Sequence, residues 1–256
     1  MTELRAFTWK EFLWTARTGK LMFSLILFVL FGIMNPAIAK LTPWLMETLA
    51  DSLADSGLNI VETTVTALTS WSQFCKNIPM AMIVFLLLFS GTLTGEYEKG
   101  TLTMILAKGL ARWKVLLAKG VMMTAVWTAG YWLCFAVTWG YNRFFWNDGS
   151  AAHVVAAGGC YYLLGLWLIT LILLTSAVFK TSGAALSAVV CSFAAVYLLG
   201  MIPAVKEYLP GFLLGGQALL ASAAEPADFV PVVLITLGMS IANLVGAAVL
   251  FARRMV

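Results

Sequence analysis

Long apolar blocks alternate with shorter polar segments along the whole chain. The blocks cover residues 21–39, 78–93, 115–140, 152–179, 184–202 and 229–251. A helix of about 20 apolar residues is long enough to cross the roughly 30 Å hydrocarbon core of a bilayer. The pattern therefore predicts an all-α integral membrane protein with six transmembrane helices.

The first twenty residues show a different pattern, in which basic residues alternate with an apolar stripe. Trp9, Phe12 and Leu13 recur at helical spacing, and the lysines and arginines fall elsewhere around the helix. Basic helices with such a stripe are typical of segments that lie in the membrane interface. We therefore expect residues 1–20 to form an interfacial helix beside the first span.

Two further segments between the blocks carry structure of their own. Residues 40–77 hold four acidic residues and leucines at four-residue intervals, which predicts a short amphipathic helix in a region outside the membrane. Residues 204–228 contain two prolines and three glycines around apolar runs that are too short to span. This second segment is predicted to form a re-entrant or interfacial hairpin before the last span.

Composition and the distribution of charge support a membrane protein and orient it. Apolar residues make up 61% of the chain and charged residues 11%, against about 45–50% and about 25% in soluble domains. With six spans, residues 1–20, 94–120, 180–183 and 252–256 share one side and hold 12 of the 16 lysines and arginines. The positive-inside rule then places both termini and residues 94–114 in the cytoplasm. The expected location of the protein is the plasma membrane.

The polar stretch between the second and third spans, residues 94–114, is the strongest candidate for a functional site. Gly95 and Gly100 have the spacing of part of a phosphate loop, but Thr101 stands where the phosphate-binding lysine would be required, which argues against a nucleotide site. An ordinary solvated loop remains an alternative. Leu102, Ile105 and Leu106 instead form an apolar stripe on a short helix.

Charged residues border that stripe, a pattern typical of a docking surface. Gly100 suits the break in the chain before such a helix, and Thr101 suits its N-cap. We therefore interpret residues 94–114 as a segment that meets a partner in water.

The sequence Glu96-x-x-x-Gly100-Thr101-Leu102, followed by Ala111-Arg112 at the next span, resembles the permease subunits of type-2 ABC transporters. The N-terminal helix resembles the elbow helix of that family, and residues 204–228 resemble its re-entrant segment. The family often has Pro-x-Ser-Arg where this chain has residues 109–112, which weakens any specific role for 109–111. The expected coupling residues are Glu96, Glu98, Lys99, Gly100, Thr101, Leu102, Ile105, Leu106 and Arg112.

The resemblance implies a transporter subunit without an ATPase site of its own. Its short helix would be a coupling helix held in a groove of a separate cytoplasmic ATPase subunit, which would bind ATP and Mg²⁺, while this chain would bind no cofactor. A second permease subunit is implied as well, with a homodimer preferred and a heterodimer open. The expected activity is export of an amphipathic peptide or peptide toxin; a drug, a lipid or an ion is the alternative cargo.

Other classes of function find less support in the residues. An intramembrane enzyme needs paired carboxylates or a His/Glu cluster within the spans, and the chain has a single histidine, His153. One histidine cannot supply the several ligands of a zinc site, so no catalytic or metal-binding residue is expected. A nucleic-acid partner is not expected either. A membrane scaffold or sensor without transport activity remains an alternative.

Overall fold

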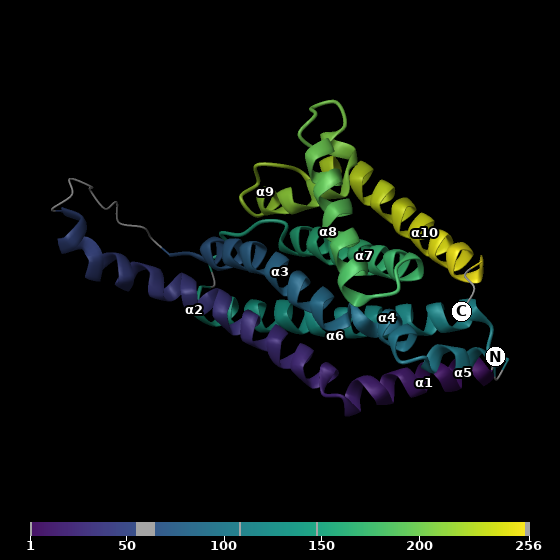
Figure 1. Cartoon of the computed structure of the whole chain (residues 1–256). Coiled ribbons are helices and arrows are strands. Elements are labelled where there is room, and N and C mark those ends of the chain that lie inside the picture. The colour runs from purple at the N-terminus through teal and green to yellow at the C-terminus, as the bar shows by residue number, and fades with distance from the viewer. Residues whose placement is uncertain (1, 55–64, 108, 147, 254–256) are drawn as a thin grey trace.

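The computed structural model describes residues 2–54, 65–107, 109–146 and 148–253, and these are almost entirely helical (Figure 1). Six helices within them are long and apolar enough to cross a membrane. They are α2 (Lys20–Ala54), α3 (Ala67–Phe89), α6 (Arg112–Phe145), α7 (Val154–Val178), α8 (Ser182–Leu199) and α10 (Val230–Arg253). The predicted all-α fold with six spans is confirmed.

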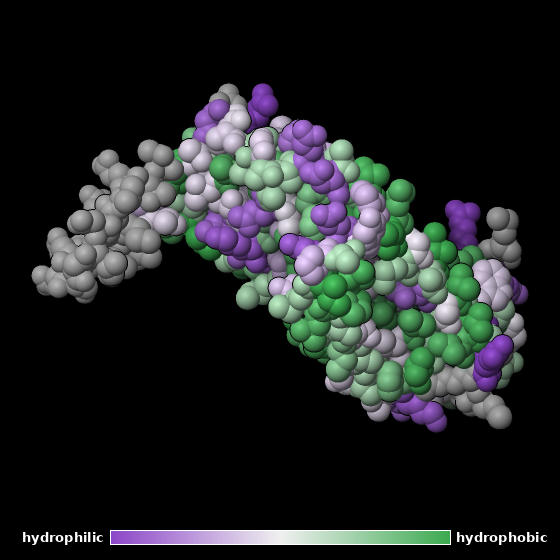
Figure 2. All heavy atoms as spheres, turned by 90° about the horizontal axis from the view of Figure 1, so that it is seen from above, coloured by the Kyte–Doolittle hydropathy of each residue, from purple (hydrophilic) through white to green (hydrophobic). Residues whose placement is uncertain are grey.

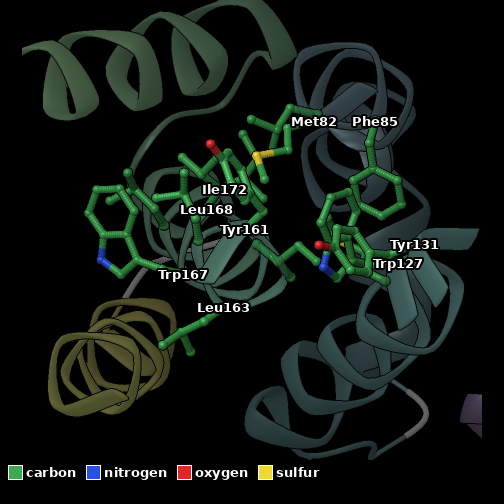
Figure 3. Close-up of a cluster of buried hydrophobic side chains, with 14 of the residues drawn as sticks. Met82, Phe85, Trp127, Tyr131, Tyr161, Leu163, Trp167, Leu168 and Ile172 are labelled. Carbon is green, nitrogen blue, oxygen red and sulfur yellow. The ribbon is translucent and has the colours of Figure 1, made fainter. Parts of the chain in front are cut away.

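Helix α7 forms the centre of the bundle, because it packs against α3, α6, α8 and α10. Figure 3 shows buried aromatic and aliphatic side chains from α3, α6 and α7 in one cluster. Trp127 and Trp167 are each 1% exposed there. Gly165 permits close packing of α7 against the Trp127 indole, since a Cβ at this position would overlap the ring. Aromatic burial between helices thus holds the middle of the bundle together.

The first two spans are longer than the apolar blocks that predict them. Helix α2 continues without interruption to Ala54, so most of the segment 40–77 is helical and is not a separate short helix. Helix α3 begins at Ala67, eleven residues before the predicted start, which places Pro79 within the helix. Hydropathy shows where lipid ends, whereas backbone hydrogen bonding lets a helix continue into water.

Helix α1 (Thr2–Arg17) meets α2 at a sharp turn, where Gly19 has a φ of +74°. Figure 1 places α1 at the end of the bundle where both chain ends are marked. We call this the terminal end of the bundle, and the other the distal end.

At the distal end, the chain after α8 folds into short helical turns: η1 (Lys206–Tyr208), η2 (Pro210–Gly216), α9 (Gln217–Leu220) and η3 (Pro226–Phe229). These turns pack on α7 and α10, and the Tyr161 hydroxyl of α7 donates to the Leu214 carbonyl at 2.7 Å. Leu213 and Leu219 are fully buried. The segment is therefore held against the bundle and does not cross it.

The outer surface of the bundle is widely apolar. Figure 2 shows broad hydrophobic areas between separate polar ones, and the exposed large side chains include Ile26 and Leu30 on α2 and Leu234 and Ile241 on α10. An apolar surface of this extent on long helices suits lipid contact, since hydrocarbon surrounds a spanning helix instead of water.

Candidate functional site

Two short helices connect α3 to α6 at the terminal end of the bundle (Figure 1). They are α4 (Gly91–Glu98) and α5 (Thr101–Ala107). Gly100 before α5 has a φ of +65° and Gly109 after it a φ of +87°. L-residues with side chains rarely adopt this left-handed backbone, so the two glycines allow the chain to turn sharply on either side of α5.

Four charged side chains form a network between α1, α4 and α6. The Lys119 ammonium of α6 lies 3.1 Å from Glu11 Oε2 of α1 and 3.0 Å from Glu96 Oε1 of α4. Lys10 Nζ lies 2.7 Å from Glu11 Oε1 and 3.3 Å from Glu96 Oε1. Two acids and two bases thus join α4 and α6 to α1, which is distant from both in the sequence.

The centre of this network is buried, because the Lys119 and Glu11 side chains are each 1% exposed. A charge without a partner in such surroundings costs several kcal/mol of desolvation. Burial also lowers the pKa of Lys10, but its hydrogen bond to Glu11 and the charges of Glu11 and Glu96 outweigh this and raise the pKa above its ordinary value. These contacts therefore favour the charged form of Lys10, and the buried ion pairs resist separation of the three helices.

Helix α4 also contacts the remaining elements at this end. The Glu98 carboxylate accepts a hydrogen bond from the Ser182 backbone N–H at the start of α8, at 3.3 Å. The Thr94 and Ser182 hydroxyls lie 2.8 Å apart, and the Tyr97 ring lies edge-on to Phe251 of α10. A movement of α4 would consequently disturb its contacts with α1, α6, α8 and α10.

The outer face of α5 differs from the predicted stripe. Leu102, expected to face a partner, is completely buried within the chain, whereas Met104 is 69% exposed. A single amphipathic helix can bury its apolar side against its own chain or against another protein, and here Leu102 anchors α5 to its own chain. The side chains of Ile105 and Leu106 lie outside the described residues.

The other predicted coupling residues divide into two groups. Glu98, Lys99, Gly100 and Thr101 are exposed on or beside the turn. Thr101 is the first residue of α5 and not its N-cap, and its hydroxyl donates to the Glu96 carbonyl at 3.5 Å. Arg112, at the start of α6, donates from Nη1 to the Phe251 carbonyl of α10 at 3.2 Å, so it joins two spans.

The N-terminal helix presents different faces to the bundle and to its surroundings. Trp9 is 61% exposed and stacks on Phe12, which is 39% exposed, while Leu13 is partly buried. Glu11 points inward to Lys119. Sequence reasoning missed both members of this pair and treated Lys119 as one more cytoplasmic charge. The sequence offered an acid among the basic residues of this helix and a lysine several residues into an apolar block, but neither feature identifies the partner.

No group of three or more His, Cys, Asp or Glu side chains suitable for a metal ion occurs within the described part of the chain. The contacts described above make this site a junction of helices, with α5 on one side and the buried ion network on the other.

Comparison with known proteins agrees with a transport role for this architecture. Residues 5–227 match the family described as "ABC-2 family transporter protein", so the chain belongs to that family and is a transporter permease. It is also 22% identical over 238 residues to the "Uncharacterized transmembrane protein YxlG" of Bacillus subtilis (strain 168), a match that covers 90% of this chain and 89% of the relative.

Proposed function

We propose that this chain is the permease subunit of an ATP-driven exporter, and that α5 with the turn before it docks on a separate cytoplasmic ATPase subunit. ATP and its Mg²⁺ belong to that partner. The observation that carries the proposal is the position of α4: it continues directly into the exposed α5 and is tied to α1 and α6 by the buried ion network.

This arrangement supports a simple transmission of movement. Moving α4 away would separate Glu96 from both Lys10 and Lys119 and leave its carboxylate without an ion-pair partner among the described residues, so α1, α4 and α6 move together when α5 is displaced. The Glu98 contact with Ser182 extends the linkage to α8. Rigid-body movement of helices of this kind is a common form of switching.

The charge distribution supports the orientation that this function requires. Helices α1 and α5 lie at the terminal end (Figure 1). With six spans, residues 1–20, 94–120, 180–183 and 252–256 share this side of the membrane and hold 12 of the 16 lysines and arginines. We place this end in the cytoplasm and the protein in the plasma membrane.

A second copy of the chain is the proposed partner within the membrane. Helix α8 buries few of its residues within the chain, and its outer face carries the small residues Gly183, Ser187, Cys191 and Ala194. Small residues permit close approach of helices in a bilayer. If α8 forms the homodimer interface, Cys191 should form a disulfide between two copies under mild oxidation in membranes, and Cys191→Ala should abolish it. A monomeric product from wild type would contradict this interface.

An amphipathic peptide is the proposed cargo. Buried charged side chains in the described chain, Glu11 and Lys119, lie at the terminal end only, and the rest of the interior is uncharged and mainly aromatic and aliphatic. Inverted membrane vesicles that contain the transporter should accumulate a labelled amphipathic peptide only with ATP. Accumulation of a hydrophobic drug or a lipid instead would reassign the cargo and leave the coupling proposal intact.

The docking of α5 is tested by changing its exposed face alone. Met104→Asp should abolish copurification of the ATPase subunit and ATP-driven transport, because it places a charge on an exposed apolar contact. Met104→Leu should retain both. Met201→Asp at the distal end is a matched control, because Met201 is 72% exposed and faces no ATPase in this orientation. An ATPase that still binds the Met104→Asp variant at normal levels would refute the assignment.

A further inference from the structure

A cavity of about 550 Å³ lies at the distal end of the bundle, far from the ion network and from α5. It is open to one side and is lined by the start of α3, the last turns of α6, the following loop and the start of α7. Trp71, Phe135 and Trp139 form much of its apolar wall. Aromatic residues near the ends of spans are typical of the membrane–water interface, so the cavity lies at the depth of lipid headgroups.

One polar side chain that lines the cavity has no hydrogen-bond partner among the described residues. Asn142 is 3% exposed, and neither its Oδ1 nor its Nδ2 is bonded within that part of the chain. Buried amides are almost always hydrogen-bonded. An unpaired donor and an unpaired acceptor in the wall of a cavity therefore point to a ligand that offers both an acceptor and a donor.

The cavity also has a cationic side chain at its mouth. The Arg143 guanidinium lies 5.6 Å from the centre of the Trp139 ring, and no carboxylate of the described residues lies within ion-pair distance of it. The nearby Asp148 carboxylate accepts hydrogen bonds from Ser150 and from the Ala67 backbone N–H. Arginine is well suited to bind phosphate oxygens.

We propose that this cavity binds a phospholipid of the leaflet at the distal end, whose headgroup carries a hydrogen-bond donor. The phosphate binds Arg143 and the Asn142 amide N–H, a hydroxyl or ammonium of the headgroup donates to Asn142 Oδ1, and an acyl chain lies along Trp71 and Phe135. The apolar wall favours a lipid over a soluble phosphate. The site is independent of the proposed export activity and of the cargo.

The proposal is tested by native mass spectrometry of the delipidated full-length chain in detergent, titrated with defined ligands. Phosphatidylglycerol and phosphatidylethanolamine should bind, since both carry a donor in the headgroup. Phosphatidylcholine, which lacks a donor, diacylglycerol, which lacks the phosphate, and glycerol phosphate, which lacks the chains, should each bind roughly tenfold more weakly or worse.

Variants separate this cavity from general lipid contact. Asn142→Leu and Arg143→Gln should each weaken phosphatidylglycerol binding by roughly tenfold, while Lys76→Gln, which removes an exposed lysine of α3 outside the cavity, should have no effect. Ala136→Phe fills the cavity without touching its polar groups and should also abolish binding, which keeps the test decisive if Asn142→Leu does not fold.

Three results would overturn the proposal. Unchanged lipid binding in the folded cavity variants would exclude the site. An equal loss with Lys76→Gln would show that only surface charge matters. Displacement of the lipid by an amphipathic peptide that binds more tightly would assign the cavity to the cargo.

Discussion

Replacing Lys119 with methionine is the sharpest test of the ion network at the terminal end. Methionine is apolar and of similar length, so the substitution removes the ammonium with little change in volume. Glu11, which is 1% exposed, would then keep only Lys10 as a partner. The three remaining side chains would carry a net charge of −1 in a largely buried setting.

The expected loss of stability follows from that imbalance. Removal of one partner from a buried ion pair costs about 3–5 kcal/mol, because the other charge is left uncompensated. For a domain of roughly this size, 1 kcal/mol shifts the melting temperature by about 2–4 °C. The Lys119→Met variant should therefore melt roughly 6–20 °C below the wild type.

Thermal unfolding of the purified protein in detergent, followed by size-exclusion chromatography, measures this shift. Adding Glu11→Gln to Lys119→Met should recover much of it, since Glu96 and Lys10 then remain as a neutral pair, and the resulting double-mutant cycle isolates the interaction. Lys114→Met is the matched control: Lys114 also joins α6 to α1, through Glu3 at 2.7 Å, but Glu3 is 63% exposed. Such surface ion pairs contribute little to folding stability, so Lys114→Met should hardly change the melting temperature.

Two outcomes would refute the reasoning. Equal destabilisation by Lys114→Met and Lys119→Met would show that burial of the network is not what makes it important. A double variant no more stable than Lys119→Met alone would show that the uncompensated Glu11 charge is not the cause of the loss.

Two other substitutions test packing and orientation. Gly165→Ala should destabilise the bundle by about 1–3 kcal/mol through overlap with the Trp127 ring, whereas Gly159→Ala on the same helix meets nothing within 4 Å; equal melting temperatures would contradict the packing argument. The orientation is tested by cysteine labelling in a cysteine-free background. Thr101→Cys should react with a membrane-impermeant maleimide only after cells are permeabilised, while Tyr208→Cys at the distal end should react in intact cells. The reverse pattern would invert the proposed orientation.

Much of the fold was predictable because its signals are local. The apolar blocks located six spans, since each needs only enough consecutive apolar residues to cross the hydrocarbon. Gly100 marked the turn before α5 because only glycine tolerates its backbone conformation readily. The continuation of α2 to Ala54 was missed, because hydropathy reports the surroundings of a helix and not its hydrogen bonds.

What the tertiary structure alone decided is which residues meet. By itself, the sequence determined the class of protein, the number of spans and the location of the polar segment between the second and third. Glu11 and Lys119 lie 108 positions apart, and nothing near either of them in the chain records the contact. Leu102 belongs to an apolar stripe that could have faced a partner, yet it is buried in its own chain. Contacts between distant segments depend on how the helices pack, and a local pattern carries no information about that packing.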